Sequence, residues 1–347
     1  MEIAIRQSVD RDEWDGLVSS SAAGNIFYTA LWGEVRRKFF RSSPYYLTLK
    51  DDGKVAALAV IEAMALGHSR LYGKPLGSIL LPLAVKRMPV LRMRDWVFID
   101  NDIKMAIDRG ELAARTEKAL AGLRPIEARV YQNALDGASV YGDALVERGF
   151  ERDEWATFVV SLEGETKKIE ERFRSSVRKA LRKAGDEQGL AVERISDLDG
   201  LKEYYSLFRS WRSAMRLWST PFDEWRVMWN ELRQYGSSFE IFVAKQGEKA
   251  VGGLGIWAYN GIMNEFGSVR SPYAAQKNLY AGDILKREII KWGRGQGFRF
   301  YDLEGVSNDP KNGKDAAIRQ FKEKWGGQFK RCDVFRKSFA GKKRAVR

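Results

Sequence analysis

The feature that most constrains the fold of this 347-residue chain is a plan of β-prone and helical segments that occurs twice. Each copy predicts two strands joined by a tight turn, then a helix and a further strand. In the first copy these elements span residues 45–50, 54–61, 111–123 and 126–131; in the second they span 239–245, 249–257, 279–294 and 298–303. The chain is also longer than a single hydrophobic core usually allows. We therefore expect two domains of similar topology.

A turn sequence adds another strand to the second copy. Asn260-Gly261 supplies the positive φ angles that a two-residue hairpin needs, so a third strand should follow directly. This order of hairpin, strand, helix and strand resembles the acyltransferase fold of the GNAT type. We therefore expect an α+β fold, an α/β sandwich of two tandem GNAT-like domains. The predicted boundaries are 1–155 for the first domain, 156–330 for the second, and 331–347 for a C-terminal strand and basic tail.

The chain is strongly basic. It has 59 Lys and Arg against 46 Asp and Glu, a formal net charge of +13 and an isoelectric point near 9.6. This charge fits a polyanionic partner such as nucleic acid, anionic lipid headgroups or a phosphorylated substrate. A basic surface that is merely solvated is the alternative.

The sequence favours a cytoplasmic location. Residues 1–6 predict a strand and lack the basic and apolar regions of a signal peptide. The longest apolar run, residues 55–66, is too short to span a bilayer. The single cysteine, Cys332, fits a reducing compartment because it cannot form an intramolecular disulfide. We expect a soluble cytoplasmic protein, with the inner membrane surface as a further location.

The scarcity of histidine and cysteine limits the available chemistry. With His68 as its one histidine and Cys332 as its one cysteine, the chain cannot build a zinc site of His and Cys ligands. His68 lies in a stretch that predicts a turn, which favours a surface position. We therefore expect no metal and no cofactor, and chemistry that rests on Asp, Glu, Lys, Arg, Tyr and the backbone.

A basic amphipathic helix is predicted from Thr166 onward. Its apolar face comprises Ile169, Phe173, Val177, Leu181 and Ala184. Its opposite face comprises Arg172, Arg174, Arg178, Lys179, Arg182 and Lys183. A face of this kind is either simply solvated or a contact surface for nucleic-acid phosphates.

The C-terminal region combines a buried-looking strand and acidic turn, residues 301–306, with a short basic helix that ends in Trp325-Gly326-Gly327. The order of these motifs resembles the signature of Fem-type aminoacyltransferases, which move an amino acid from aminoacyl-tRNA onto a peptidoglycan precursor. Further segments that carry the resemblance are Gly149-Phe150, Thr157 to Leu162, Val177 to Ala180 and Asn278 to Ile290. The resemblance covers most of residues 150–330. Glu304-Gly305 departs from the two glycines that the family typically shows there.

The resemblance implies a metal-independent aminoacyltransferase. Its donor is aminoacyl-tRNA, and its acceptor is an amine of a peptidoglycan-precursor-like or other phosphorylated molecule, either UDP-linked or lipid-linked. It also implies a cleft for the acceptor and a channel for the 3′ end of the tRNA. The basic face from Arg172 to Lys183 becomes the expected tRNA contact. The interval between Leu201 and Glu240 is too short for the coiled-coil arm of some members.

Catalytic roles follow from the matched positions. Phe321-Lys322 matches the Phe-Lys pair of the family, and the Lys322 ammonium is expected to stabilise the oxyanion that forms at the aminoacyl carbonyl. A surface lysine on an amphipathic helix is the alternative. Asp302 and Glu304 alternate at a strand end, so one of them can accept the proton of the attacking amine. Their alternative role is pairing with Arg299 or Arg319.

Substrate-binding roles fall mainly to aromatic and guanidinium groups. Trp32 and Arg36 match a family motif whose basic residue grips the acceptor diphosphate, and a planar guanidinium suits phosphate. Arg216 is the expected second phosphate ligand, and Arg212 fits nearly as well. A further pair, Tyr280 and Tyr301, either lines the cleft or belongs to the core.

Two other functions compete with this one. An acetyl-CoA-dependent GNAT N-acyltransferase needs a glycine-containing loop that cradles pyrophosphate, and neither residues 276–282 nor residues 100–110 supply one. A non-enzymatic nucleic-acid-binding protein would use the basic face with Trp211, Trp218, Trp225 and Trp229, whose spacing is also typical of a helix core.

Overall fold

The structure, a computed structural model, describes residues 1–66, 85, 89–136, 141–217, 219–233 and 238–339. The chain divides into two compact units, each built on one mixed sheet. The first unit comprises Met1–Ala156 and Lys330–Arg347, and the second comprises Thr157–Phe329. His68 and Trp218 lie outside the described residues.

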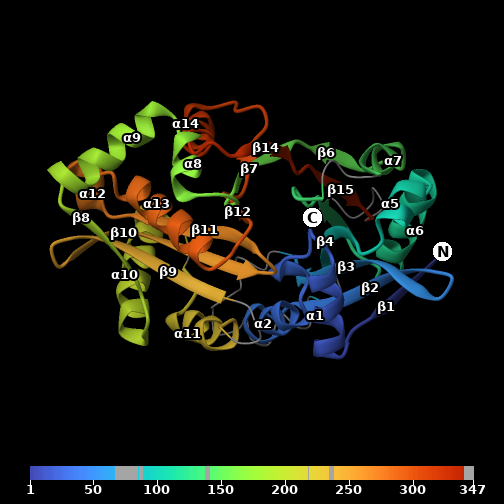
Figure 1. Ribbon diagram of the computed structural model, residues 1–347. Helices are drawn as coiled ribbons and strands as arrows, with labels where there is room; N and C mark the ends of the chain where they lie inside the picture. The colour runs from blue at the N-terminus through green and yellow to red at the C-terminus, as the bar shows by residue number, and fades with distance from the viewer. Residues whose placement is uncertain (67–84, 86–88, 137–140, 218, 234–237, 340–347) are drawn as a thin grey trace. The chain divides into compact units, whose positions relative to one another are not determined.

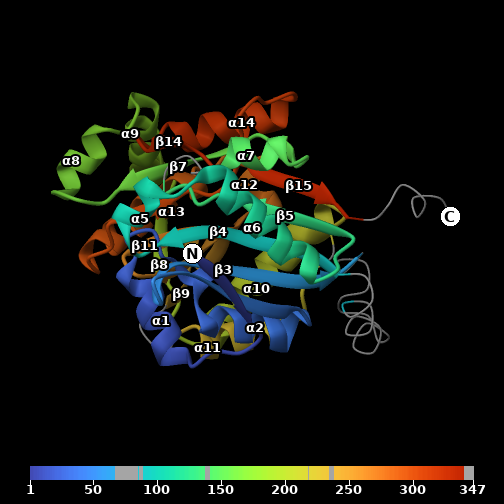
Figure 2. The same cartoon turned by 90° about the vertical axis from the view of Figure 1, so that its right-hand side faces the viewer.

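The first unit is a seven-stranded sheet with helices on both faces (Figures 1 and 2). Its elements are β1 (Glu2–Arg6), α1 (Arg11–Ser20), η1 (Ile26–Tyr28), α2 (Ala30–Phe40), β2 (Ser43–Asp51), β3 (Lys54–Ala65), β4 (Pro89–Phe98), α5 (Asn101–Ala106), α6 (Arg109–Gly122), β5 (Glu127–Tyr131), α7 (Gly142–Glu147), β6 (Glu151–Asp153) and β15 (Val334–Ser338). The strand order is β1-β2-β3-β4-β5-β15-β6. Strands β4 and β5 are parallel, and their other neighbours are antiparallel.

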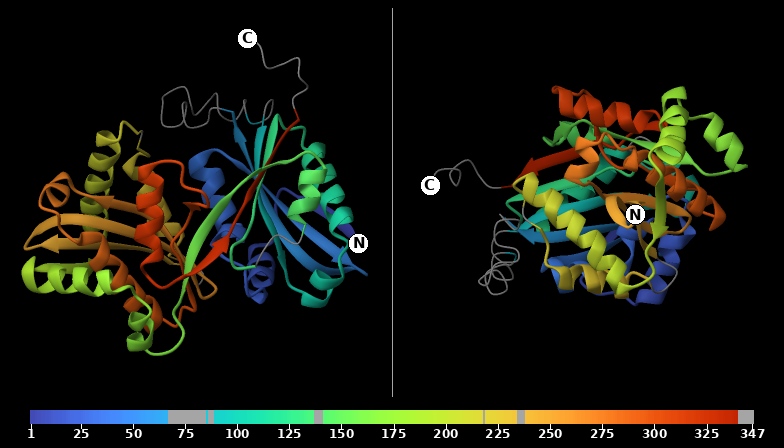
Figure 3. Two further views of the ribbon diagram at one scale, coloured as in Figure 1. Left: turned by 90° about the horizontal axis from the view of Figure 1, so that it is seen from above. Right: turned by 90° about the vertical axis from the view of Figure 1, so that its left-hand side faces the viewer.

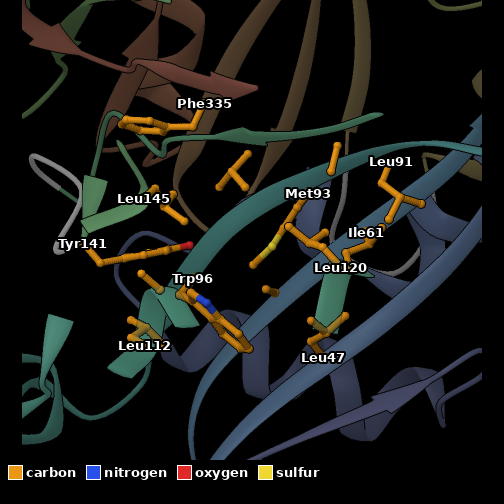
Figure 4. Close-up of a cluster of buried hydrophobic side chains, with 14 of the residues drawn as sticks. Leu47, Ile61, Leu91, Met93, Trp96, Leu112, Leu120, Tyr141, Leu145 and Phe335 are labelled. Carbon is orange, nitrogen blue, oxygen red and sulfur yellow. The ribbon is translucent and has the colours of Figure 1, made fainter. Parts of the chain in front are cut away.

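Alternate residues of β2 show how the two faces of this sheet are covered. Leu47 belongs to the core that includes Leu112 and Leu120 of α6 (Figure 4). Its neighbour Tyr46 points to the opposite face, where its ring lies 5.1 Å from that of Trp14 in α1. Strand β3 is therefore mostly apolar, because both of its sides are buried over most of its length, and Glu62 is the polar residue that interrupts the longest apolar run of the sequence. No helix in the part of the chain that the structure describes is both long and apolar enough to cross a membrane.

The C-terminal strand is an integral part of the first sheet. From the sequence we set residues 331–347 apart as a separate segment, but β15 pairs with β5 on one side and β6 on the other (Figure 3, red strand). Phe335 is fully buried in the core of the first unit. This pairing joins residues far apart in the chain, which local sequence patterns do not report.

The second unit repeats the plan with its own sheet. Its elements are β7 (Trp155–Ser161), α8 (Thr166–Glu171), α9 (Ser175–Arg182), the π-helical turn η2 (Lys183–Glu187), β8 (Leu190–Arg194), α10 (Leu198–Ala214), α11 (Phe222–Glu231), β9 (Ser238–Gln246), β10 (Lys249–Tyr259), β11 (Ile262–Arg270), α12 (Pro272–Gln276), α13 (Ala281–Gly295), β12 (Phe300–Asp302), β13 (Val306–Ser307), α14 (Gly313–Glu323) and β14 (Gln328–Arg331). The strand order is β13-β7-β12-β11-β10-β9-β8, and β14 pairs with β7. Strands β11 and β12 are parallel, as β4 and β5 are in the first unit.

Adjacent glycines in β10 let two helices approach opposite faces of this sheet (Figures 1 and 3). A Cβ on Gly252 would lie 3.0 Å from Ala281 of α13, whereas a Cβ on Gly253 would lie 2.6 Å from the ring of Tyr204 in α10. The hairpin predicted at Asn260-Gly261 is confirmed, with φ angles of 51° and 74° that suit a two-residue turn.

The continuous basic helix predicted from Thr166 was wrong. The segment consists of α8, α9 and η2, and it is interrupted at residues 172–174. The interruption has a tertiary cause: the Phe173 ring packs 5.1 Å from Trp325, and the Arg174 amide donates to the carbonyl of Lys324. The predicted apolar face is otherwise correct, because Ile169, Phe173, Val177 and Ala184 are buried.

Candidate active site

A group of polar side chains collects where two strands of the second unit diverge. The parallel ladder between β11 and β12 ends at the pair Asn264 and Asp302. Strand β11 continues to Arg270, whereas β12 stops at Asp302 and the chain turns away. Glu304 takes a left-handed conformation in this turn, with φ of 62°, and its amide donates to Asp302 Oδ1 at 2.8 Å. The divergence therefore places both acidic residues predicted from the sequence at one point.

Lys322 reaches this point from α14. Its ammonium donates to the backbone carbonyls of Glu304 at 2.9 Å and Gly305 at 3.2 Å. An ammonium has three N–H donors, so in the described part of the chain one remains for a ligand. The two carbonyl contacts fix the position of Nζ, so the sequence correctly placed Lys322 beside Glu304.

Phe321 packs against the start of α13. A Cβ on Gly282 would meet its ring at 3.4 Å, and the Trp325 ring centroid lies 6.4 Å away. The ring also faces two ammonium groups, with Lys324 Nζ 4.2 Å and Lys286 Nζ 5.6 Å from its centroid. These contacts with two ammonium groups hold the ring of Phe321, the residue next to Lys322, in place.

Asp302 is buried beneath the turn. It accepts a hydrogen bond from the Thr157 hydroxyl at 2.5 Å, and that hydroxyl also lies 3.0 Å from the carbonyl oxygen of Glu304. Burial raises the pKa of the Asp302 carboxyl, while the bonds from Thr157 and the Glu304 amide and the charge of Lys322 oppose the rise. The alternative partners considered from the sequence, Arg299 and Arg319, are therefore not the ligands of this carboxyl.

Asn264 lies beside the acidic turn and is also buried. Its amide nitrogen donates to Glu304 Oε1 at 3.1 Å. Its own oxygen, Oδ1, is buried and has no hydrogen-bond partner among the described residues. Such an unused buried acceptor is unusual in a folded protein and is typical of a site that takes up a donor from a ligand or from ordered water.

A buried ion pair underlies the site, and the sequence reasoning missed it. Lys286 of α13 pairs with Glu265 of β11, and Tyr301 donates its hydroxyl proton to Glu265 Oε2 at 2.8 Å. Burial lowers the pKa of Lys286, and Lys322 lowers it further, whereas Glu265 opposes the change. Burial also raises the pKa of Tyr301, as does the neighbouring Glu265 charge. A lysine on the apolar face of α13 was the signal that could have revealed the pair.

The predicted phosphate ligand of the first unit, Arg36, is already partly engaged. Its Nε donates to Glu62 Oε1 at 2.5 Å. Its guanidinium carbon lies 3.9 Å above the Phe40 ring and 5.8 Å from the Trp32 ring. The carboxylate and the rings hold the guanidinium in place and leave part of its donor set for an anion.

The corresponding residues of the second unit lie at the end of α10. Arg216 is exposed and has a left-handed backbone, with φ of 54°. Arg212 lies 5.7 Å from the centroid of the Phe208 ring, and burial lowers its pKa.

The basic residues predicted to contact tRNA fall into two groups, those that contact other parts of the protein and those that face solvent at least in part. Arg172, Arg174 and Arg178 contact other parts of the protein: Arg172 and Arg178 donate to the carbonyls of Ser161 and Phe173, and Arg174 pairs with Glu323 at 2.8 Å. Lys179 and Arg182 are exposed on α9, and Lys183 is half-buried at the start of η2. Of the tryptophans proposed for nucleic-acid stacking, Trp225 and Trp229 are buried in the core.

The start of α13 is filled by protein groups. The Tyr280 amide donates to Gln188 Oε1 at 2.9 Å, and Asp283 in the first turn pairs with Lys324. In the first unit, the Asp108 side chain caps α6 by accepting from the amide of Glu111. Among the described residues, no group of three or more His, Cys, Asp or Glu is arranged to hold a metal ion. One backbone amide at each of these two helix starts is therefore already bound by a side chain, Tyr280 by Gln188 and Glu111 by Asp108.

The second unit matches a known family. Residues 171–323 fit the model of the acetyltransferase (GNAT) domain. This part of the chain is therefore similar to a GNAT domain. No curated protein sequence matches the chain. This match supports an acyltransferase. The polar side chains Asn264, Asp302, Glu304 and Lys322 all lie within the matched residues.

Solved structures extend the likeness to both units. FemX superimposes with a TM-score of 0.70 at 15% identity and covers 96% of this chain and 97% of its own. A tandem GNAT protein from the clavulanic acid biosynthesis pathway gives a TM-score of 0.56 at 10% identity, covering 98% and 99%. The C-terminal domain of a putative lysylphosphatidylglycerol synthetase from Agrobacterium fabrum gives 0.55 at 13% identity, covering 95% and 93%. At these identities the likeness shows the fold, and the predicted tandem GNAT fold with its Fem-type resemblance is confirmed.

Proposed function

We propose that the protein is an aminoacyltransferase that moves an amino acid from aminoacyl-tRNA to an amine of a phosphorylated acceptor. The observation that carries the proposal is the position of the Lys322 ammonium, held by the carbonyls of Glu304 and Gly305 beside the buried Asp302. A cation fixed next to carboxylates suits a reaction in which an oxyanion develops while an amine loses a proton.

The proposed step forms one bond and breaks one bond. The acceptor nitrogen attacks the ester carbonyl carbon of the aminoacyl group, and the remaining N–H of Lys322 stabilises the oxygen as it gains negative charge. Asp302 or Glu304 takes the proton of the attacking nitrogen. The ester C–O bond then breaks, and the same carboxylic acid returns the proton to the ribose oxygen as it leaves. No cofactor enters this sequence, because the ester itself is the activated group.

Asn264 offers a hydrogen-bond acceptor that can bind the acceptor amine at this point. Its buried Oδ1 is an unused acceptor, and its amide nitrogen contacts the same Glu304 carboxylate. An amine that donates one N–H to Asn264 Oδ1 would satisfy this oxygen. The remaining N–H would point toward the carboxylates that receive its proton.

The donor is best explained as tRNA. Lys179, Arg182 and Lys183 supply positive charge on α9 and η2 without the internal contacts that Arg172, Arg174 and Arg178 make. Contacts of this type to phosphates make affinity fall steeply with salt. Each unit offers its own candidate for binding a phosphate: Arg36 in the first unit, and Arg216 with Arg212 in the second.

Acetyl-CoA is the competing donor, and the start of α13 disfavours it. A coenzyme A pyrophosphate normally binds open amides at a helix start. Here the Tyr280 amide, directly before α13, is already bound by Gln188. This contact adds to the argument made from residues 276–282, where all positions except Gly282 carry side chains that hinder close approach of the backbone to a pyrophosphate.

A transfer assay tests the proposal. The full chain is incubated with a mixed pool of charged tRNAs and a set of UDP-linked and lipid-linked acceptors, and products are searched by mass for an increment of one amino acid. We expect such a product, and we expect Lys322→Ala and Arg36→Ala to lower its rate of formation strongly while tRNA affinity persists. Acetyl transfer from acetyl-CoA, together with tight acetyl-CoA binding by calorimetry, would replace this function with an N-acetyltransferase. Binding of tRNA without any transfer would support a non-enzymatic nucleic-acid-binding protein.

A further inference from the structure

The end of α10 and the turn that follows it combine exposed apolar side chains with arginines. Between Glu203 and Asp223 the sequence contains Arg209, Arg212 and Arg216 but neither Asp nor Glu. At the end of this helix Met215 is 52% exposed and Leu217 is 46% exposed, on either side of Arg216. An aliphatic pair of this exposure within a cationic, acid-free stretch is not explained by the core of the second unit.

The turn that presents these side chains is well ordered by hydrogen bonds. The amide of Met215 donates to Trp211 O at 3.1 Å, and that of Leu217 donates to Arg212 O at 2.8 Å. Arg216 occupies a left-handed position, with φ of 54°, where glycine is the usual residue after a helix. A non-glycine residue in this conformation costs free energy, so the arginine at this position points to a function.

Helix α10, which precedes this turn, is held in place by its packing against α11. Phe208 packs 4.8 Å from the buried Trp225 of α11, and the Arg212 guanidinium lies 5.7 Å from the Phe208 ring. Arg209 is exposed in the last two turns of α10, the helix that ends directly before Met215. The anchored helix therefore holds the apolar tip and its surrounding cations in a fixed arrangement.

We propose that the Met215–Leu217 turn, with Arg209 and Arg212, docks on the surface of an anionic lipid bilayer. Side chains such as Met and Leu gain free energy when they enter the boundary between headgroups and acyl chains, and nearby arginines are attracted to anionic headgroups. The charge of the stretch selects an anionic surface, because no acidic residue lies within it to attract a cationic one.

Nucleic acid is a poorer fit for the same surface. Single-stranded nucleic acid binds proteins largely through aromatic rings on which bases stack. Among the described residues of this tip the exposed apolar side chains are Met215 and Leu217, whereas Phe208 and Trp211 are half-buried and Trp225 is buried. The proposal stands independently of the transfer reaction, because it concerns a docking surface and its test requires no catalysis.

Vesicle sedimentation of the full chain tests the proposal. We expect binding to vesicles of phosphatidylglycerol and phosphatidylcholine, and binding that is at least about tenfold weaker to phosphatidylcholine alone, because arginines near an anionic surface are attracted to its headgroups. The double variant Met215→Ser/Leu217→Ser and the variant Arg209→Gln should each weaken binding to the anionic vesicles. Met105→Ser is the matched control, because Met105 is 85% exposed in the first unit and should leave binding unchanged.

A second measurement reports insertion directly. In a Cys332→Ser background, Leu217→Cys labelled with an environment-sensitive dye should shift to shorter emission wavelength with anionic vesicles, and Met105→Cys should not. Equal loss of binding in the Met105 control, no dye shift at position 217, or vesicle binding unchanged by Met215→Ser/Leu217→Ser would overturn the proposal. A dye response to single-stranded RNA in place of vesicles would reassign the surface to nucleic acid.

Discussion

Lys322 Nζ lies 2.9 Å from the backbone carbonyl oxygen of Glu304, so the cation from α14 is tied to the turn that follows β12. Changing Lys322 to Ala removes the proposed oxyanion donor but no core packing. We expect kcat to fall by about 100-fold or more, because losing one such donor typically costs that much. The change in KM should be smaller. Lys314→Ala, an exposed position on the same helix, is the control and should retain full activity. Equal rates for the two variants would exclude Lys322 from the chemistry.

Asp95 in the first sheet occupies the position that Glu265 occupies in the second. Each directly follows the last residue paired in the parallel ladder, Arg94 with Tyr131 in one sheet and Asn264 with Asp302 in the other. Both carboxylates are buried. The duplicated fold therefore places a buried acidic residue at the same point of strand divergence in both units.

This buried position makes stability depend on pH through Asp95. Burial raises the pKa of Asp95 from 3.8 to about 7, while a hydrogen bond from Tyr141 opposes the rise. The folded state therefore keeps this proton up to about pH 7, whereas the unfolded chain loses it near pH 4. The contribution of Asp95 to the free energy of unfolding falls as pH rises through this interval, by up to about 4 kcal/mol.

The measurement is the free energy of urea unfolding between pH 4.5 and 7.5 in wild type and Asp95→Asn. The variant should show a flatter pH dependence, because its amide does not titrate. Asp102→Asn, which changes an exposed side chain of the same unit, should keep the wild-type slope. Identical slopes in wild type and Asp95→Asn would show that Asp95 does not titrate in this range.

Lys286 and Glu265 should be strongly coupled in stability. Lys286→Met leaves the Glu265 carboxylate buried without its cation, and we expect a loss of about 3–5 kcal/mol in the free energy of unfolding. Adding Glu265→Gln should recover much of this loss, because no buried charge then remains. A double-mutant cycle in urea measures the coupling. Lys291→Met, whose half-exposed ammonium pairs with Glu288 on the same helix, should cost less than about 1 kcal/mol. Additive effects of the two core variants would contradict the ion pair.

Gly326 is required by both conformation and space. Its φ is 69°, and a Cβ there would lie 2.6 Å from the carbonyl oxygen of Arg172. Gly326→Ala should lower the free energy of unfolding by about 2–4 kcal/mol, through backbone strain and displacement of the segment at Arg172. Gly313→Ala is the control, because a Cβ at Gly313 meets no atom within 4 Å and the residue begins α14. A Gly326→Ala protein as stable as wild type would show that the Arg172 segment yields without cost.

Much of the fold was readable from the sequence because it depends on local signals. The hairpin at Asn260-Gly261 follows from the φ angles that its turn residues adopt readily. The helix α13 and the strand β12 follow from periodicity and from the glycines between them. The order of the sequence motifs led us to expect Lys322 near the acidic turn, and in the structure its ammonium donates to the carbonyl of Glu304.

The sequence by itself determined the repeated topology, the turns and the amphipathic faces, because each is encoded within a few neighbouring residues. Tertiary structure alone decided that β15 enters the first sheet, that the basic helix breaks at residues 172–174, and that Lys286 meets Glu265. Each of these depends on a partner distant in the chain. Pairing, packing and charge neutralisation over such distances have no local periodicity, and they exist only once the sheets have formed.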